Sequence, residues 1–203
     1  MYIGADADLH PSRNIQVLNS TFDRNGRQGI SVTGAEHVLI KNNTIADVRM
    51  CVIDLEPMST DWYVKDVEIV RNTLGPRRIT VLSAATQGDV DNVTLSDNTV
   101  IGTLRLVVEA KNAAERYSGF TLVVNVATAV VNSGGPSMGF TKVDDVYLSG
   151  NTIRFKAGSD SDLMALENSA HILIENNDLS GVDSIFNLRD SLSYDCVASN
   201  NKI

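Results

Sequence analysis

Apolar and polar residues alternate in short stretches along this chain, and these stretches share one pattern. It is an apolar residue, any residue, an apolar residue, two more residues, then Asn, any residue and an apolar residue. Val38 to Ile45 and Val67 to Leu74 are clear copies. The Asn position is occupied by Ser20, Asn43, Asn72, Asn98, Asn125, Asn151, Asn177 and, in a degenerate last copy, Asn201. The successive spacings of 23, 29, 26, 27, 26, 26 and 24 residues are typical of a solenoid.

The pattern predicts one short strand before each Asn. Its two apolar residues are two positions apart and therefore face the same side of a strand. One short strand cannot bury that side stably, whereas coils stacked about 4.8 Å apart pair their backbones and align the apolar residues into interior columns. A recurring Asn at the bend can face inward, tolerate an unusual backbone conformation and bond the Asn one coil away. A buried ladder of amides is then paired except at its ends.

Other repeat folds fit less well. Helices would need apolar residues three and four positions apart, and almost no stretch has that spacing. Leucine-rich repeats share an Asn, but their Leu-rich consensus is missing. β-Propellers need about four strands per blade and a period nearer 40 residues.

The repeated pattern resembles that of right-handed parallel β-helix proteins in the pectate-lyase-like superfamily, which includes phage tailspike domains. The resemblance implies an all-β, single-stranded right-handed parallel β-helix of about seven to eight coils with an internal Asn ladder between the second and third sheets. The repeated pattern then supplies sheets two and three. Sheet one is expected at 29–32, 51–56, 78–82, 104–109, 163–167 and 185–189, and Tyr2 to Ala5 is expected to form another first-sheet strand.

We expect residues 1–203 to form one domain, cut within a coil at both ends from a longer protein. The net charge of −8 disfavours nonspecific binding to nucleic acid or to an anionic membrane. Neither a membrane-spanning apolar run nor a signal peptide is visible in the sequence.

The cysteines and histidines predict no disulfide and no metal site. Cys51 and Cys196 lie about six coils apart, or roughly 29 Å, which is beyond disulfide reach and favours core positions. His37 and His171 lie about five coils apart, or roughly 24 Å, and cannot share an ion. We therefore predict no metal and no cofactor.

One segment carries candidate chemistry. Asp54 and Glu56 alternate with inward Ile53 and Leu55, so both should face outward with Cα atoms about 6.6 Å apart. Two such carboxylates suit glycoside cleavage, in which one protonates the leaving oxygen and the other activates water or attacks carbon. Arg27 is the third candidate catalytic residue.

The predicted glycan-binding residues surround this pair or continue along the first sheet. Ser31 and Thr80 should stack on either side of Asp54, and arginines in the loops entering the sheet could bind a carboxylate or an acidic sugar. The full set is Gln28, Ser31, Arg77, Arg78, Thr80, Glu109 and Arg189.

The resemblance strengthens this assignment. The segment Arg27-Gln-Gly-Ile-Ser31, followed by Ile53-Asp-Leu-Glu-Pro57, is similar to a combination that recurs in phage-associated and bacterial β-helix proteins. In the superfamily the substrate groove runs over the first sheet, and the lyases bind calcium through acidic residues. Here Ser31 and Thr80 occupy the positions expected beside Asp54, so a calcium-dependent lyase is not predicted.

Three functions remain open. The favoured hypothesis is a glycan-recognising module of a phage tail or bacterial cell-surface protein, located on a virion or an extracellular surface and forming a homotrimer. Its partner would be a polysaccharide or cell-surface glycan. The second is a glycoside hydrolase or polysaccharide lyase using Asp54 and Glu56. The third is a purely structural spacer, since outward carboxylates near arginines are common on protein surfaces.

Overall fold

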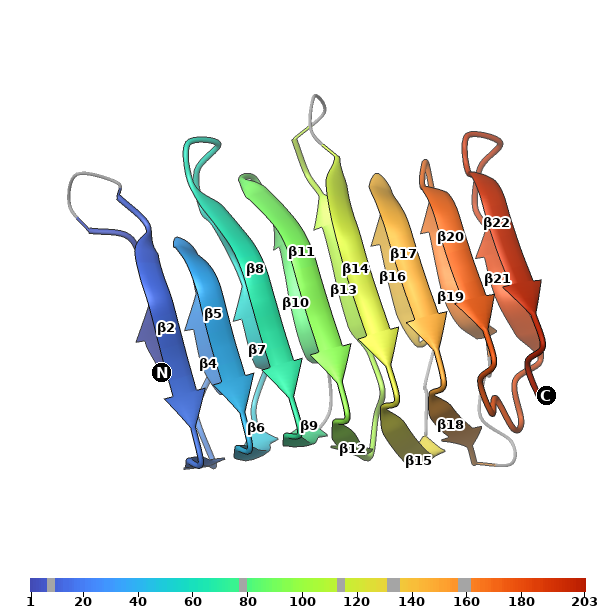
Figure 1. Cartoon of the computed structure of the whole chain (residues 1–203), viewed down its shortest axis with the longest axis horizontal. Helices are drawn as coiled ribbons and strands as arrows, with labels where there is room; N and C mark the ends of the chain where they lie inside the picture. The colour runs from blue at the N-terminus through green and yellow to red at the C-terminus, as the bar shows by residue number, and fades with distance from the viewer. Residues whose placement is uncertain (7–9, 77–79, 113–115, 131–135, 157–161) are drawn as a thin grey trace.

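The chain forms a solenoid of three parallel sheets. The computed structural model describes residues 1–203 except 7–9, 77–79, 113–115, 131–135 and 157–161. Two sheets have eight strands and the third has six, and the described residues include no helix. The coils climb one axis from the N-terminus to the C-terminus (Figure 1). The predicted fold class is confirmed. In the described part of the chain, no helix is long and apolar enough to cross a membrane.

We name the sheets A, B and C in the order in which each coil passes through them. Sheet A contains β1 (Tyr2–Ile3), β4 (Ile30–Val32), β7 (Cys51–Leu55), β10 (Thr80–Thr86), β13 (Leu106–Ala110), β16 (Met138–Thr141), β19 (Asp162–Glu167) and β21 (Ser184–Leu188). Sheet B contains β2 (Ser12–Leu18), β5 (Ala35–Lys41), β8 (Tyr63–Val70), β11 (Asp89–Ser96), β14 (Tyr117–Val123), β17 (Val143–Ser149), β20 (Ala170–Glu175) and β22 (Tyr194–Ser199). Sheet C contains β3 (Thr21–Asp23), β6 (Thr44–Val48), β9 (Thr73–Pro76), β12 (Thr99–Ile101), β15 (Val126–Val130) and β18 (Thr152–Phe155).

The apolar positions of the repeat form continuous columns inside the solenoid. In sheet B one column runs through register partners Val38, Val67, Val93, Phe120, Val146 and Ile172. All six are at most 1% exposed. Phe120 also packs edge-on against Phe140 of sheet A, with ring centroids 6.2 Å apart. The period-two alternation therefore decides which side of each strand is buried.

The predicted Asn ladder is present at the bend between sheets B and C. Each side-chain amide donates to the Oδ1 of the Asn in the next coil, at 2.9–3.0 Å, from Asn43 through Asn201. That Oδ1 also accepts the preceding ladder residue's backbone N–H, as between Ser20 and Asn43 at 2.9 Å. The ladder thus satisfies polar groups that the bend would otherwise bury unpaired.

The unusual backbone conformation lies one residue before the position we expected. The ladder Asn residues are not left-handed; the residue preceding each of them is. These residues are Asn19, Asn42, Arg71, Asp97, Val124, Gly150, Asn176 and Asn200, with φ between +49° and +65°. The reason is that the left-handed residue makes the bend, which leaves the following Asn free to turn inward.

Sheet A differs in one strand from the prediction. The expected runs correspond to β4, β7, β10, β13, β19 and β21, but β16 was not predicted. Its inward residues Met138 and Phe140 are separated by Gly139, and it follows a Gly-Gly-Pro segment, a sequence typical of turns. Tyr2 and Ile3 do pair with β4, as expected.

Candidate functional site on the outer face of sheet A

The outer face of sheet A brings together most of the predicted site residues that the structure describes. Parallel pairing aligns one outward residue from each of its eight strands into a row along the solenoid axis. The row is Tyr2, Ser31, Asp54, Ser83, Val107, Gly139, Ala165 and Asn187. Most of these side chains are short, and two hollows lie along the strip that the row forms.

Asp54 lies at the centre of the N-terminal part of this strip. It pairs with Ser31 in register, as predicted. Although it is on the outer face, it is only 7% exposed. Gln28, in the turn before β4, donates its Nε2–H to Asp54 Oδ2 at 2.8 Å. The amide therefore covers and orients the carboxylate, and the predicted neighbourhood of Gln28, Ser31 and Asp54 is formed.

The prediction that Thr80 stacks on the other side of Asp54 is wrong. Ser83 pairs with Asp54, whereas Thr80 pairs with Cys51. Thr80 lies 26 residues after Asp54, the commonest spacing of the repeat, but the coil from Asn43 to Asn72 is 29 residues long. The longer connection between β7 and β8, residues 56–62, accounts for the difference. Arg77 and Arg78 lie outside the described residues.

Glu56 follows β7 and is half-buried beside Asp54. Its backbone N–H donates to Val32 O at 2.8 Å, which continues the pairing of β7 with β4. Burial raises the pKa of Glu56, and the nearby Asp54 charge and a hydrogen bond between the two carboxyl groups raise it further, while Arg27 and Lys111 oppose the shift. Glu56 therefore holds a proton more readily than an exposed glutamate does.

A hollow of about 320 Å³ lies over this cluster. Its lining includes Arg27, Gln28, Ser31 and Glu56, four of the predicted site residues, together with Met1, Tyr2, Thr33 and Met58. Tyr2 was not predicted as a site residue. It is 65% exposed and its hydroxyl accepts a hydrogen bond from Thr33 Oγ1 at 2.7 Å. An exposed aromatic residue at the start of the row was the signal that could have identified it.

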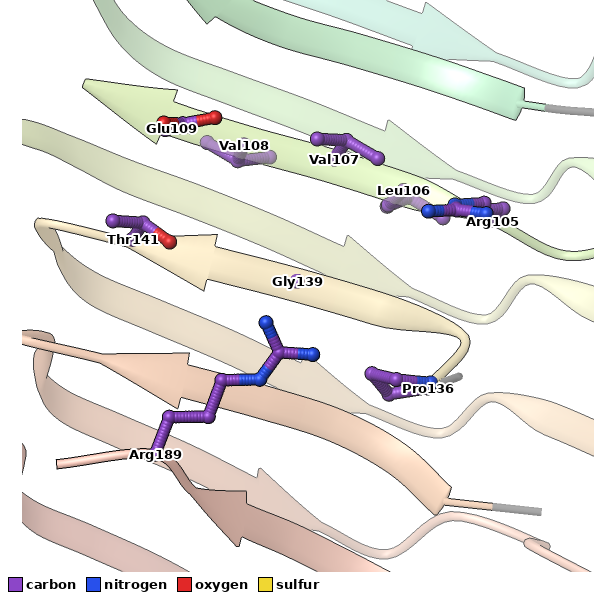
Figure 2. Close-up of a pocket in the computed structure, with 9 residues that line it drawn as sticks. All are labelled: Arg105, Leu106, Val107, Val108, Glu109, Pro136, Gly139, Thr141 and Arg189. Atoms are coloured by element: carbon purple, nitrogen blue, oxygen red, sulfur yellow. The ribbon is translucent and has the colours of Figure 1, made fainter. Parts of the chain in front are cut away.

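A second hollow, of about 190 Å³, lies farther along the same face (Figure 2). It contains the remaining predicted site residues, Glu109 and Arg189. Arg105, Thr141 and Pro136 also line it, and Gly139 lies on its floor. Sequence reasoning missed Gly139 and Thr141 because it missed β16.

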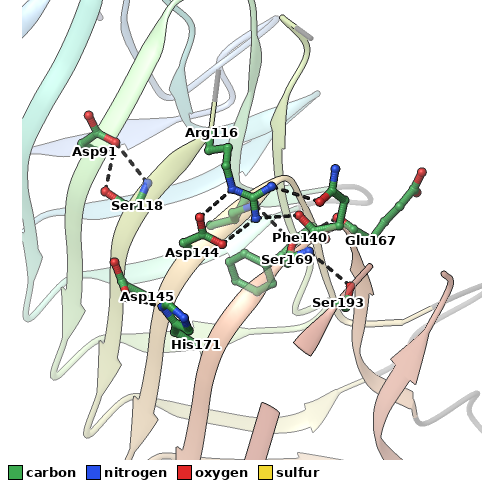
Figure 3. A network of polar contacts seen from close by, with 12 residues as sticks. Asp91, Arg116, Ser118, Phe140, Asp144, Asp145, Glu167, Ser169, His171 and Ser193 are labelled. Carbon is green, nitrogen blue, oxygen red and sulfur yellow. Dashed lines mark hydrogen bonds and ion pairs between the residues drawn. The ribbon is translucent and has the colours of Figure 1, made fainter. Parts of the chain in front are cut away.

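Another polar network, around Arg116, lies away from this face (Figure 3). Arg116 immediately precedes β14 and donates from Nε and Nη2 to Asp144 at 2.6 Å, and it also reaches Asn168 in the following coil. The guanidinium hydrogen bond lowers the pKa of Asp144. The Arg116 network therefore fastens three consecutive coils together.

The structure also places the cysteines and two of the histidines. Cys51 is buried and Cys196 packs against the core, and neither forms a disulfide. His37 and His171 lie on the surface, each near one aspartate. Among the described residues, no three His, Cys, Asp or Glu side chains lie close enough to hold a metal ion.

Comparison with known proteins identifies a family and similarities to individual proteins. The model of a family described as "Right handed beta helix region" matches residues 4–114. An α-1,3-galactosidase A of Bacteroides fragilis (strain YCH46) is 29% identical over 140 residues, which cover 60% of this chain and 23% of that protein. The crystal structure of a periplasmic alginate epimerase, AlgG, aligns over 100% of this chain and 55% of its own at 14% identity, with a TM-score of 0.27.

Proposed function

This chain belongs to the right-handed β-helix family, and from that premise we propose that it binds an extended polysaccharide along the outer face of sheet A. One observation carries the proposal: a strip of short side chains runs along the axis through two hollows lined by Arg, Gln, Glu and Thr. An extended glycan could follow this strip and make modest hydrogen bonds at each coil. The similarity to a protein named as a galactosidase supports a sugar ligand.

Tyr2 supplies an apolar surface at the N-terminal end of the strip. The Thr33 hydroxyl contacts its hydroxyl group, and Gly4 leaves room for its ring, because a Cβ on Gly4 would lie 2.7 Å from Tyr2 Cε1. A held, exposed aromatic ring next to polar side chains suits a sugar, which has an apolar face and a rim of hydroxyl groups. We therefore include Tyr2 with Gln28, Ser31 and Glu56 in the binding surface.

The test is binding to an array of bacterial surface polysaccharides and oligosaccharides. The wild-type protein should bind at least one glycan, and Tyr2→Ala and Gln28→Ala should each weaken that binding about tenfold or more. Gln16→Ala is the matched control, because Gln16 is an exposed glutamine in the edge strand of sheet B. An array without a bound glycan, or equal losses for Gln28→Ala and Gln16→Ala, would contradict the proposal and favour a structural spacer.

A second candidate function is cleavage of the bound glycan. The raised pKa of Glu56 favours it as the acid that protonates a leaving oxygen. The charge of Asp54 contributes to this shift, so Asp54 lies near enough to Glu56 to serve as the second carboxylate of the pair. Arg27 would balance the charge on Glu56.

Measuring product release separates cleavage from binding. If the protein is a hydrolase or a lyase, Glu56→Gln and Asp54→Asn should abolish release of shorter oligosaccharides while glycan binding is retained. Unchanged turnover in both variants would remove these residues from catalysis. Binding without any product from the wild-type protein would leave recognition as its function.

We further propose that this recognition takes place at a bacterial cell surface or on a phage tail, as part of a homotrimer. Surface polysaccharides are the ligands that an elongated polar strip could follow over several sugars. Light scattering coupled to size exclusion tests the assembly. A trimer should have three times the 22.0 kDa mass of the chain. A mass of 22 kDa at all concentrations would contradict the trimer without affecting the glycan proposal.

A further inference from the structure

The second hollow contains two arginines without a partner among the described residues. Arg105 and Arg189 both line it, and neither side chain forms an ion pair or hydrogen bond with a described residue. Four other arginines are paired with carboxylates, namely Arg13, Arg24, Arg116 and Arg154. Arg105 and Arg189 differ from the remaining described arginines because they line one hollow together. Two guanidinium groups are therefore available on one side of the molecule for a ligand.

Gly139 keeps the floor of the hollow open. It pairs in register with Val107 of β13 and Ala165 of β19, so a side chain at this position would point outward between them. A Cβ built on Gly139 meets nothing within 4 Å, and its φ is outside the left-handed region that would require glycine. Packing and backbone conformation thus leave the position open to larger residues, but a larger residue would fill the hollow.

The lining combines cationic and hydroxyl-binding groups around that floor. Arg105 immediately precedes β13 and Arg189 immediately follows β21, so they approach the hollow from opposite corners. Figure 2 shows the Arg189 guanidinium extending over the sheet toward Gly139, with Glu109 and Thr141 at the same end of the strands. Guanidinium groups bind planar or tetrahedral anions through paired hydrogen bonds, and the carboxylate and hydroxyl can bind sugar hydroxyls.

The overall charge restricts the kind of anionic ligand. The chain carries −8, so its long-range field repels a densely charged polyanion. An isolated acidic group on an otherwise neutral glycan would experience mainly the local guanidinium groups, because charges more than about 8–10 Å away are screened at physiological salt. The chemistry therefore favours a glycan with widely spaced acidic substituents.

We propose that the second hollow is a subsite for one acidic group, a carboxylate, sulfate or phosphate, on the glycan bound along sheet A. The inference rests on the proposed function. It adds that the ligand is an acidic glycan and that the acidic group binds at a distance from Asp54 and Glu56. Gly139 lies three strands from Asp54 in the order β7, β10, β13 and β16, or about 14 Å at the strand spacing. An extended oligosaccharide would be needed to occupy both places.

The experiment uses a glycan array with matched neutral, uronate-bearing, sulfated and phosphorylated oligosaccharides, followed by calorimetry with the best ligand and its neutral counterpart. Binding of the uronate-bearing oligosaccharide is compared with binding of the same oligosaccharide after its carboxyl group has been reduced. We expect an acidic glycan to bind about tenfold or more tightly than its neutral form at low salt, with the advantage shrinking as salt is added. The acidic oligosaccharide that binds most tightly identifies whether a carboxylate, a sulfate or a phosphate is recognised.

The variants Arg105→Gln and Arg189→Gln should remove most of the preference for the acidic form while lowering affinity for the neutral form much less. Arg71→Gln is the matched control, because Arg71 is an exposed arginine at the bend between sheets B and C and its side chain has no partner among the described residues. Gly139→Val should weaken both forms without lowering the unfolding midpoint, because a side chain at this position would extend into open space.

The outcomes separate this inference from the proposed function. Neutral and acidic forms that bind equally, or an acidic preference that survives both arginine substitutions, would overturn the subsite and leave glycan binding intact. If Gln28→Ala binds both glycan forms more weakly but still prefers the acidic form, the result would support both the proposed function and the subsite. If the array shows no binding at all, the proposed function and the subsite fail together.

Discussion

Replacing one interior member of the Asn ladder should destabilise this protein strongly. Asn98 is 1% exposed. Its Nδ2 donates to Ile69 O at 2.7 Å and to Asn125 Oδ1 at 3.0 Å, and its Oδ1 accepts the backbone N–H of Asn72 at 2.9 Å and the Asn72 side-chain amide at 3.0 Å. In Asn98→Ala, all four of these hydrogen bonds are lost.

The cost follows from the buried groups that remain. The Asn72 N–H loses its acceptor and the Ile69 carbonyl loses one of its donors, and a buried group left unpaired costs about 1–3 kcal/mol. Asn72 also loses one of its side-chain bonds, but Asn125 Oδ1 still accepts the backbone N–H of residue 98. Allowing for partial relaxation, we expect a loss of about 3–5 kcal/mol, near the upper end for single substitutions.

Urea unfolding followed by circular dichroism measures this loss, provided that the wild-type and variant proteins unfold in a single transition. Asn201→Ala is the matched control. Asn201 accepts the same two kinds of bond from Asn177 and donates to Ile174 O, but it is half-exposed at the end of the ladder, where water can replace the lost partners. We expect it to cost about 1 kcal/mol. If Asn98→Ala costs no more than Asn201→Ala, the ladder does not stabilise the bends in the way described here.

Three further predictions concern single residues. Val124 is a β-branched residue at φ +55° where the other coils have Asn, Asp, Arg or Gly, so Val124→Asn should raise the urea midpoint by the equivalent of about 1 kcal/mol; an unchanged or lower midpoint would show that the bend is unstrained. Because the folded-state pKa of Glu56 lies above its unfolded value, near 4.5, its contribution to stability is present at lower pH and is lost as the pH rises through the raised pKa. Glu56→Gln should therefore flatten the pH dependence above about pH 4.5, and an identical slope in both proteins would contradict the shift. Tyr117 is buried and its hydroxyl approaches Thr86 O at 2.9 Å and Gly88 O at 2.8 Å, so Tyr117→Phe should lower stability by about 1–2 kcal/mol in the same urea assay, whereas no change would indicate that these carbonyls are satisfied otherwise.

The solenoid was predictable because its interior repeats. Two apolar residues and one Asn per coil are required by the same geometry every time, so their spacing indicated sheets B and C and the ladder. Sheet A was less predictable because its strands lie farther from the ladder positions and the connections vary in length. Because of the extra residues between β7 and β8, Ser83 and not Thr80 lies beside Asp54. In β16 a glycine interrupts the alternation of apolar and polar residues.

The candidate site was predictable only where strand alternation decides it. Alternation placed Asp54 on the outer face beside Ser31, and the structure agrees. It could not show that Gln28 covers Asp54, because that contact depends on the turn before β4. It also could not show the hollow over Gly139, because a hollow depends on the relative heights of side chains from several coils.

The difference between inward and outward residues explains how one fold could carry a binding surface that varies in sequence. Inward residues and ladder amides are coupled from coil to coil, so a change such as Asn98→Ala affects the neighbouring coils. Outward residues of sheet A contact mainly the next strand, and Gly139 faces open space, so changes there can alter the ligand with little effect on the interior. If Gly139→Val weakens glycan binding and Asn98→Ala weakens folding, the two faces of each strand serve different purposes. If Gly139→Val also unfolds the protein, the outer strip is part of what stabilises the coils, and its short side chains reflect packing instead of recognition.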